Sequence, residues 1–468
     1  MSTQQLNGQY RENFKNLPNH NGLRSGKGLE NRENLQNLKN LERRENWKNL
    51  KVLIVGSGGR EHVLAWKCLQ SPLVDEVYCA PGNPGMGAAV TRVDIAVDDV
   101  QGMVKFAGEN QIDLTVVGPE APLLDGIVDA FAAAGLQAYG PSAKAARMEG
   151  SKSEAKAFME RWSIPTAGYQ VCYSVAEAEA FIDEHGAPIV VKVDGLASGK
   201  GVVVAMTVAE AKAAVSDFHV PGSCIILEEY MEGEEVSLLA FVDGETVVPM
   251  AFAQDHKPVF DGDRGPNTGG MGAYSPVPQF GSDVMETALE QIVRPTAAGL
   301  VAEGTPFRGI LYTGLMITDE GPKVVEYNVR FGDPEAQALL PRLKTDLVEI
   351  LLASMAGRLA EMDVQWKQQA AATVVAASAG YPGDYPCRVP IQGDVVSQRY
   401  SSMVFHAGTD LDGKQFVTNG GRVLAVTGLG DSLDEALKAA YARLGNVHFA
   451  GMHYRKDIGQ KALQAVGC

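Results

Sequence analysis

Residues 51–61, with the sequence KVLIVGSGGRE, decide the fold class of this chain. The apolar run at 52–55 is typical of a strand that is buried on both faces of a parallel sheet. A glycine-rich turn at 56–59 follows it and leads into a helical pattern. Further strand-like runs alternate with helical patterns downstream, which predicts an open α/β domain over residues 51–151.

The turn after this first strand suggests a ligand. Gly58, Gly59, Arg60 and Glu61 open the helix, and the free N–H groups of a helix N-terminus attract phosphate. A dinucleotide site is disfavoured, because its motif needs a third glycine where Glu61 stands and an acid after the second strand, where residues 80–82 read APG. Binding of a small phosphate is the favoured interpretation, with a dinucleotide site and a merely tight turn as alternatives.

Downstream of residue 151 the pattern changes to α+β. Strand-like runs with antiparallel character, such as 188–192 and 202–206, are separated by helical patterns. We expect a domain over residues 152–350 into which a smaller lobe, at about 171–232, is inserted. A third unit over residues 370–468 begins with a new apolar strand and ends with a helix and a polar tail.

The first 50 residues differ from the rest of the chain. They hold eleven Asn and no Asp, and the segment RENFKNL at 11–17 returns as RENWKNL at 44–50. Such a segment has too few apolar positions to offset its ordering entropy. It is predicted to be a disordered or weakly helical extension, with a partner-binding tail as the alternative.

Bulk composition narrows the function classes. The formal net charge of −16 disfavours nucleic-acid binding. The six cysteines are scattered without a C-x-x-C pair, which indicates a reduced compartment. The chain shows neither an apolar run of roughly 20 residues nor a hydrophobic signal segment. We therefore expect a cytoplasmic protein that binds neither membranes nor nucleic acids.

Residues 195–201, GLASGKG, resemble a P-loop but depart from it. Only three residues separate the first two glycines, Gly201 stands where Ser or Thr is required, and a strand follows instead of a helix. A glycine-rich hairpin that folds over the phosphates of a nucleotide is the better description. Lys192 precedes it inside an apolar strand, where a lysine is costly unless it meets an anion. Contact with phosphate is favoured, and a snorkelling lysine at a sheet edge is the alternative.

Two further segments are polar but less specific. The acids at 228–235 follow an apolar strand and, taken alone, would more often be solvated, although downstream of Lys192 they could bind adenine and ribose. The glycine-dense loop at 265–274 predicts a close approach of backbone to a ligand. His256, just before this loop, is more often structural than catalytic when considered alone.

The sharpest cluster lies at 324–335, VVEYNVRFGDPE. Residues two apart in a strand share a face, so Glu326, Asn328 and Arg330 are predicted to point the same way. A carboxylate, an amide oxygen and a guanidinium on one face suit Mg²⁺ together with phosphate. The alternative is an ordinary solvated face, with the apolar residues between them forming the core side.

Taken together, these strings resemble the phosphoribosylamine–glycine ligase (glycinamide ribonucleotide synthetase) family of the ATP-grasp superfamily. The resemblance covers residues 51–468 and rests on strings that occur in the order of the family, namely VGSGGREH, VGPE, MEGSK, VKVDGLASGKGV, LEEYMEGEE, QDHK, GPNTGGMGAYSP, EYNVRFGDPE and GMHYRKDIG. It implies a multidomain α/β and α+β fold: an N-terminal open α/β (pre-ATP-grasp) domain, a central ATP-grasp domain with an inserted lid lobe, and a C-terminal mixed α/β domain. The connection at 218–223 is shorter than in the family, and the N-terminal extension is not part of its pattern.

The resemblance also implies roles for individual residues. The metal ligands for Mg²⁺ or Mn²⁺ would be Glu326 and Asn328, and the catalytic residues Arg330 and Lys192. The residues that bind ATP would be Lys152, Lys192, Gly199, Lys200, Gly201, Glu228, Glu229, Tyr230 and Glu235. The residues that bind the other substrates would be Gly58, Gly59, Arg60, Glu61, Glu120, Asp255, Lys257 and Arg330.

The reaction implied is the condensation of glycine with 5-phosphoribosylamine through glycyl phosphate, driven by ATP. Another ATP-grasp ligase with a different carboxylate, a dinucleotide-dependent oxidoreductase and a non-catalytic nucleotide sensor are the rival interpretations. The QDHK and GPNTGGMG strings disfavour the first rival, and Glu61 disfavours the second. Lys192, Glu326 and Arg330 disfavour the third. The partners expected are small molecules, and the chain is expected to work as a monomer, with a dimer as the alternative.

Overall fold

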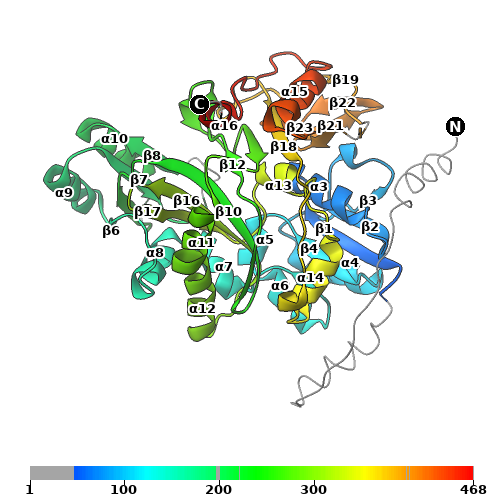
Figure 1. Cartoon of the computed structure of the whole chain (residues 1–468), viewed down its shortest axis with the longest axis horizontal. Helices are drawn as coiled ribbons and strands as arrows, with labels where there is room; N and C mark the ends of the chain where they lie inside the picture. The colour runs from blue at the N-terminus through cyan, green and yellow to red at the C-terminus, as the bar shows by residue number, and fades with distance from the viewer. Residues whose placement is uncertain (1–46, 197–200, 221, 397, 400, 467–468) are drawn as a thin grey trace.

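The computed structural model describes residues 47–196, 201–220, 222–396, 398–399 and 401–466. Nearly all of the N-terminal extension lies outside the described residues, so its predicted conformation stays a prediction. The remainder forms three α/β regions, which Figure 1 shows as a blue and cyan part, a green part that extends to the left, and an orange and red part at the top. The multidomain fold class predicted from the sequence is confirmed.

The first region is a parallel sheet with the order β3-β2-β1-β4-β5. Its strands are β1 (Leu50–Gly56), β2 (Val74–Pro81), β3 (Val90–Arg92), β4 (Leu114–Val117) and β5 (Ala138–Tyr139). Its helices are α3 (Gly59–Cys68), η1 (Pro84–Met86), α4 (Val100–Glu109), α5 (Glu120–Leu124), α6 (Ile127–Ala133) and α7 (Ala143–Gly150). Residues 52–55 of β1 are fully buried, as their apolar run predicted. The carboxyl ends of β1 and β4 are neighbours, and ligands of open α/β sheets bind at such ends.

The lid lobe is an antiparallel sheet with the order β6-β9-β7-β8. It consists of β6 (Tyr169–Cys172), β7 (Ile189–Val193), β8 (Val202–Ala205) and β9 (Ile225–Glu229), covered by α9 (Val175–His185) and α10 (Val208–Phe218), and it follows α8 (Lys152–Arg161). Its buried apolar side chains form a cluster of their own. β7 and β8 pair in antiparallel fashion on either side of residues 195–201, which confirms that a strand and not a P-loop helix follows this segment.

The body of the central region is a second antiparallel sheet, with the order β11-β10-β16-β17. Its strands are β10 (Glu234–Asp243), β11 (Thr246–Pro249), β16 (Arg308–Thr318) and β17 (Gly321–Asn328). The helices of this part of the chain are α11 (Ser282–Ala288), η2 (Leu289–Val293), α12 (Arg294–Ala302), α13 (Glu335–Leu339), α14 (Leu347–Met355) and η3 (Leu359–Glu361). β17 carries the sequence VVEYN and faces the lid lobe across the site described below.

The C-terminal sheet has the order β12-β15-β18-β23-β20 and is built from two parts of the chain. β18 (Ala370–Ala377), β20 (Ser402–His406) and β23 (Arg422–Gly430) come from its own region, whereas β12 (Gln254–Asp255) and β15 (Gly272–Ser275) come from the central one. α15 (Leu433–Leu444) packs on β23 and β18, and α16 (Gln460–Val466) follows. Two-stranded ribbons are formed by β13 (Pro258–Phe260) with β14 (Arg264–Asn267), β19 (Gln392–Gly393) with β24 (Val447–His448), and β21 (Thr409–Asp412) with β22 (Gln415–Thr418). None of the helices in the described part of the chain has the length and apolarity needed to cross a membrane.

Candidate active site

A cavity of about 450 Å³ is lined by residues from all three regions. Arg60 and Glu120 come from the first region, Lys192 and Glu326 from the central one, and Arg422 from the C-terminal one. This volume falls in the range typical of sites for small molecules.

Most of the site residues expected from the sequence line this cavity. They are Arg60, Glu120, Lys152, Lys192, Gly201, Glu228, Glu229, Tyr230, Glu235, Asp255, Lys257, Glu326, Asn328 and Arg330. Gly58, Gly59 and Glu61 are not among the lining residues. Gly199 and Lys200 lie outside the described residues.

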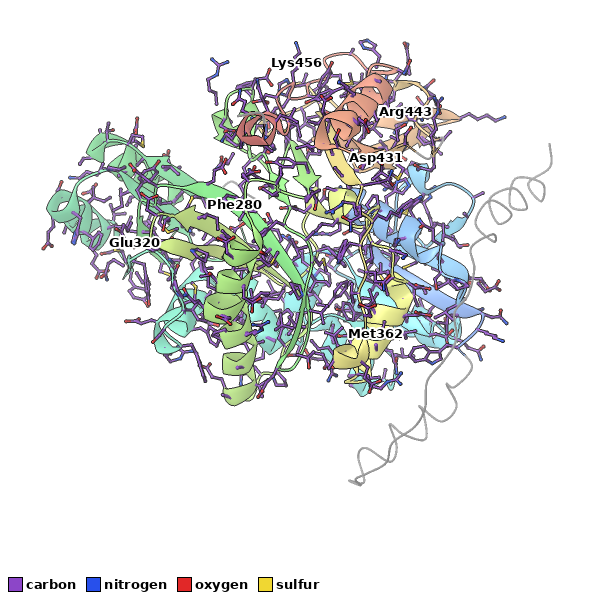
Figure 2. All side chains as sticks on the ribbon, in the orientation of Figure 1. Phe280, Glu320, Met362, Asp431, Arg443 and Lys456 are labelled. Carbon is purple, nitrogen blue, oxygen red and sulfur yellow. The ribbon has the colours of Figure 1, made fainter. Side chains whose placement is uncertain are left out.

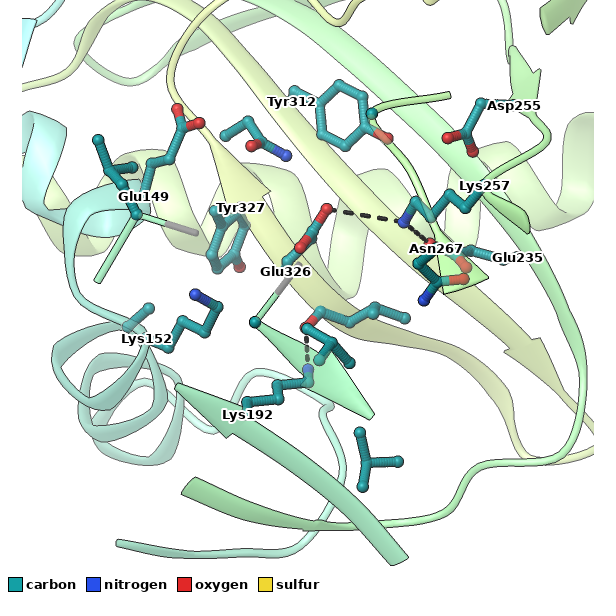
Figure 3. Close-up of a pocket in the computed structure, with 18 of the residues that line it drawn as sticks. Glu149, Lys152, Lys192, Glu235, Asp255, Lys257, Asn267, Tyr312, Glu326 and Tyr327 are labelled. Atoms are coloured by element: carbon teal, nitrogen blue, oxygen red, sulfur yellow. Dashed lines mark hydrogen bonds and ion pairs between the residues drawn. The ribbon is translucent and has the colours of Figure 1, made fainter. Parts of the chain in front are cut away.

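Glu326 on β17 is surrounded by cationic side chains. The Lys257 ammonium lies 3.6 Å from Glu326 Oε1 and also bonds to the Glu235 carboxylate. Figure 3 shows Lys152 and Lys192 on the other side of Glu326. Burial alone would raise the pKa of Glu326, but the charges of Lys257, Lys192, Lys152 and Arg330 outweigh it and lower the pKa to about 2. The carboxylate is therefore ionised at neutral pH.

The shared face predicted for the polar residues of β17 is confirmed. Glu326, Asn328 and Arg330 all line the cavity. Of the residues between them, Val329 is buried away from it, whereas Tyr327 is buried and also borders the cavity. The interpretation of these residues as an ordinary solvated face is therefore wrong.

Lys192 is only 4% exposed and lies on an interior strand of the lid sheet. Its ammonium donates to Glu228 Oε2 (2.9 Å) and to the carbonyl of Val325 (3.0 Å). The alternative of a snorkelling lysine at a sheet edge is wrong. Glu228 is equally buried, whereas Glu229 is exposed, so only part of the acidic run is solvated.

Arg330 is held between two carboxylates. Its Nε lies 3.1 Å from Glu120 Oε2 and its Nη2 lies 2.8 Å from Glu149 Oε1. The second oxygen of Glu149 accepts the N–H of Val329 (2.7 Å). Burial raises the pKa of Glu149 to about 7 against the opposing charge of Arg330. This carboxyl therefore changes charge within the physiological range.

Two backbone donors at the start of α3 have protein partners. The Gly58 N–H donates to Glu61 Oε2 (2.6 Å), and the Arg60 N–H donates to Asp333 Oδ2 (3.3 Å). The Arg60 side chain bonds to Glu61 Oε1 (2.6 Å) and to the Phe331 carbonyl (3.0 Å). A phosphate at this turn would compete with Asp333 for the Arg60 N–H.

The glycine-dense loop at 265–274 packs closely against protein. A Cβ atom at Gly270 would lie 2.4 Å from Pro334 Cδ, and the φ of +111° also favours glycine there. Gly269 lies against Arg422, whose Nη1 donates to the carbonyls of Gly269 (2.7 Å) and Asp333 (2.6 Å). These two glycines therefore allow the loop to approach Pro334 and Arg422, a reason that differs from the expected approach to a ligand.

His256 is buried beside the C-terminal segment. Its Nε2 accepts the N–H of Gly459 (3.3 Å), and burial lowers its pKa to about 4. It is not among the lining residues of the cavity. These contacts support the structural interpretation of His256.

Several lining residues were not anticipated from the sequence. They are Glu149, Lys156, Asn267, Thr268, Tyr312, Asp333, Glu335, Tyr381 and Arg422. Glu149, Asn267, Thr268, Asp333 and Glu335 fall inside the strings MEGSK, GPNTGGMG and RFGDPE, which offered a signal. Lys156 and Arg422 fall outside the quoted strings.

Comparisons with known proteins agree over all three regions. The N domain of phosphoribosylglycinamide synthetase matches residues 50–149, its ATP-grasp (A) domain matches 150–336, and its C domain matches 371–461. The phosphoribosylamine–glycine ligase of Halalkalibacterium halodurans is 53% identical over 418 residues, which cover 88% of this chain and 97% of that protein. The enzyme of the same name from Escherichia coli K12 is 52% identical over 423 residues, covering 88% of this chain and 99% of that protein.

Solved structures with similar folds were also found. The crystal structure of phosphoribosylamine–glycine ligase from Thermotoga maritima matches with a TM-score of 0.77 and 34% identity, covering 87% of this chain and all of that one. A biotin carboxylase from Campylobacter jejuni shares the fold alone, with a TM-score of 0.65 and 12% identity over 86% of this chain and 92% of that one. On these grounds the chain belongs to the phosphoribosylglycinamide synthetase family.

Proposed function

We propose that the protein is an ATP-dependent carbon–nitrogen ligase that joins glycine to 5-phosphoribosylamine. The products are glycinamide ribonucleotide, ADP and phosphate, in purine biosynthesis. The observation that carries the proposal is a single cavity in which Glu326 and Asn328 lie close to buried lysines. Relatives that match 88% of the chain are named phosphoribosylamine–glycine ligase, which supports the choice of substrates.

ATP would lie between the lid lobe and β17. Lys152 and Lys192 line this part of the cavity and would contact its phosphates, beneath the loop that contains Gly199, Lys200 and Gly201. Glu228, Glu229 and Tyr230 would border the adenine, and Glu235 would hold the ribose. Because the Glu228 carboxylate accepts bonds from buried lysines, it would also fix the position of Lys192.

The residues of β17 fit a divalent cation. Glu326 offers an ionised carboxylate and Asn328 an amide oxygen, which are hard ligands of the kind that Mg²⁺ and Mn²⁺ accept. Among the described residues, no group of three or more His, Cys, Asp and Glu side chains is arranged as a metal cage. Glu326 and Asn328 are thus the residues that would hold the cation. It would supply charge neutralisation for the transferring phosphoryl group.

The chemistry requires activation of a carboxylate. A glycine carboxylate oxygen attacks the γ-phosphorus, the bond to the bridging oxygen breaks, and ADP leaves. The nitrogen lone pair of phosphoribosylamine then attacks the carbonyl carbon of glycyl phosphate, and the C–O bond to phosphate breaks. The leaving phosphate can take the proton that the nitrogen loses.

The side chains of the protein would act by position and charge. Lys192 and Arg330 would oppose the negative charge that develops on the phosphoryl and acyl oxygens. Arg60, Glu120, Asp255 and Lys257 would bind glycine and phosphoribosylamine, with Gly58, Gly59 and Glu61 shaping the turn that receives the ribose phosphate. Because the cavity is bounded by three regions, it would keep water from the acyl phosphate.

The direct test is ADP release by the purified protein with Mg-ATP, glycine and freshly generated phosphoribosylamine, each omitted in turn. We expect release to need all three and glycinamide ribonucleotide to accumulate. ADP release that does not depend on glycine would show that the cavity binds a different phosphoryl acceptor. A folded protein that binds ATP without any turnover would instead be a nucleotide sensor.

We also infer the organisation of the whole chain. The domains would span residues 51–151, 152–350 with the lid lobe at about 171–232, and 370–468, after the extension of residues 1–50. The family matches at 50–149, 150–336 and 371–461 support these limits. The protein would act in the cytoplasm, and it would be a monomer. Light scattering during size exclusion tests the monomer by comparing the measured mass with the 49.9 kDa of one chain.

A further inference from the structure

The string GMHYRKDIG at 451–459 has no role in the site described above, yet it contains one of the most buried charged residues of the described chain. Arg455 is 1% exposed. Its guanidinium forms a fork on Asp457, with Nε at 2.8 Å from Oδ1 and Nη2 at 2.7 Å from Oδ2. Its Nη1 bonds to Asp263 Oδ1 (2.8 Å) and to the carbonyl of Pro258 (3.1 Å). Asp263 and Pro258 both belong to the β13–β14 hairpin.

The residues around Arg455 bind the same hairpin. The Lys456 N–H donates to Asp261 Oδ1 (2.8 Å), and His453 Nε2 lies 2.8 Å from the carbonyl of Val259. The Gly262 N–H donates to Asp457 Oδ2 (2.8 Å). Figure 2 labels Lys456 at the top of the molecule, in the C-terminal part. The C-terminal segment thus forms hydrogen bonds and ion pairs with the hairpin along its length and at its tip.

The hairpin needs such support. β13 and β14 form a two-stranded sheet of their own, with an irregular register, and a lone two-stranded hairpin is at best marginally stable in water. Its apolar anchor is small, with Val259 packed against Met271, Ala377 and Tyr381. Polar contacts from the C-terminal segment therefore supply much of what holds it in place.

The base of the hairpin carries part of the cavity wall. Asn267 ends β14, Lys257 and Thr268 directly adjoin the two strands, and all three line the cavity. The N–H and the hydroxyl of Thr268 both donate to the carbonyl of Lys257, at 2.8 and 2.7 Å, which closes the base. The Lys257 ammonium faces Glu235 and Glu326. A shift of the hairpin would move this ammonium relative to Glu326.

We infer that Arg455 is a positioning residue, which fixes the β13–β14 hairpin and thereby places Lys257 and Asn267 in the cavity. The inference rests on the proposed function, in which Lys257 binds glycine and phosphoribosylamine. The competing explanation is that Arg455 only stabilises the C-terminal region. The two differ in what happens to substrate binding in a protein that remains folded.

The experiment compares four variants in the full-length protein: Arg455→Met, Asp263→Asn, the double variant, and Arg443→Met as a matched control. Arg443 is a buried arginine of the same region that pairs with Asp394 (2.7 Å) and lies on α15, as labelled in Figure 2. Asp263→Asn weakens the same link from the hairpin side, and it also removes the pair between Asp263 and Lys461 of α16 (2.6 Å). For each variant we would measure kcat and the KM values for glycine and phosphoribosylamine. We would also measure the Kd of Mg-ATP and the hydrogen exchange of residues 257–268.

We expect Arg455→Met and Asp263→Asn to raise the KM for glycine or phosphoribosylamine about tenfold, because small misplacements of binding groups have large effects. The Kd of Mg-ATP should rise less than these KM values, because the lid lobe keeps its contacts and only the pairs of Lys257 with Glu235 and Glu326 are disturbed on the ATP side. The double variant should show less than the sum of the two single effects, because both changes remove the Arg455–Asp263 pair. Hydrogen exchange at 257–268 should accelerate in these variants and not in Arg443→Met.

Three outcomes would each overturn the inference. The first is a folded Arg455→Met variant with unchanged KM values and unchanged hydrogen exchange. The others are additive effects in the double variant and an equal change of KM in Arg443→Met. Should Arg455→Met fail to fold, Asp263→Asn decides the question alone. The exchange measurement needs no substrate, so it tests the tether even if the wild type proves not to use glycine. That result would refute the proposed function separately.

Discussion

Lys156 and Lys192 direct their ammonium groups to the same oxygen of Glu228, at 3.1 and 2.9 Å. Lys156 comes from α8 and is 2% exposed, whereas Lys192 comes from β7 in the lid lobe. Burial lowers the pKa of Lys156 to about 8 against the attraction of Glu228. One carboxylate balances one of the two cations, so a positive charge remains for the phosphates of a nucleotide.

The first prediction concerns this shared oxygen. When Lys156 is replaced by Met, Lys192 is the only lysine that pairs with Glu228. The Glu228 carboxylate then neutralises the positive charge that Lys192 would offer to ATP. We expect the KM for ATP to rise about tenfold, equivalent to roughly 1.4 kcal/mol, with a smaller effect on kcat. Steady-state kinetics at saturating glycine measure it. Lys144→Met, at an exposed position on α7, is the control, and equal KM values in the two variants would contradict the prediction.

The second prediction concerns Glu326. Glu326→Gln keeps the shape of the side chain but removes the charge that is shared by Lys257, Lys192 and Lys152. We expect kcat to fall by about a hundredfold or more and the Mg²⁺ concentration for half-maximal rate to increase. A Mg²⁺ titration of ADP release measures both quantities. Glu320→Gln, at the exposed turn between β16 and β17, is the control and should leave both quantities unchanged. A normal Mg²⁺ requirement in Glu326→Gln would show that Glu326 is not a metal ligand.

The third prediction concerns the pH dependence of activity. Burial raises the pKa of Glu149 to about 7, so this carboxyl loses its charge, and its ion pair with Arg330, as the pH falls through 7. We expect kcat/KM to decline on the acid side of about pH 7. In Glu149→Gln this limb should vanish, leaving a low and flat profile between pH 6 and 8.

The same group has the opposite effect on stability. A carboxyl whose pKa is raised by folding binds its proton more tightly in the folded protein than in the unfolded chain. Between its ordinary value of 4.5 and about 7, ionisation of Glu149 therefore lowers the free energy of unfolding as the pH rises. Because His62 contributes a slope of the opposite sign in both proteins, the Glu149 contribution is the difference between them. As the pH rises from 5 to 7, urea unfolding should show a smaller gain in the free energy of unfolding for the wild type than for Glu149→Gln. An acid limb that persists in the variant would show that another group controls activity.

The fourth prediction concerns acid stability. His62 on α3 is buried, and its Nδ1 accepts the N–H of His406 (2.9 Å) from the C-terminal sheet. Burial lowers the pKa of His62 from 6.5 to about 3, so the unfolded chain takes up the proton first. Stability is therefore lost as the pH falls below 6.5, by about 2 kcal/mol at pH 5 for this group.

His62→Gln keeps an acceptor for the His406 N–H and removes the titration. The loss of stability between pH 7 and pH 5, measured by urea unfolding, should be smaller in this variant than in the wild type. His448→Gln, at an exposed position, should lose as much as the wild type. A full loss in His62→Gln would assign the acid sensitivity to other groups.

Local patterns were sufficient to predict those parts of the site that lie on one strand or turn. The alternation along β17 placed Glu326 and Asn328 on one face, because the side-chain period of a strand depends on its own residues. Lys192 could be recognised because a charge in an apolar strand stands out. The helix after the glycine-rich turn was predictable for the same local reason.

The rest depends on contacts between distant parts of the chain. Lys156 lies on a polar helix, where a buried lysine looks like any surface lysine. The donors of the turn before α3 looked free, but Asp333, far along the chain, accepts one of them. The glycine-dense loop was predicted to approach a ligand, whereas the neighbours that crowd Gly269 and Gly270 are Arg422 and Pro334, from other parts of the fold. No pattern within a window of residues contains this information.

The mixed origin of the C-terminal sheet limits how this protein can be recombined with its relatives. β12 and β15 complete a sheet whose other strands begin at residue 370. A chimera joined near residue 370 would bring together strands from two parents within one hydrogen-bonded sheet. Exchange between homologues should therefore be tolerated only where the two parents agree along the β15–β18 seam. The residues at that seam are paired in one ladder, although about a hundred positions separate them in the sequence.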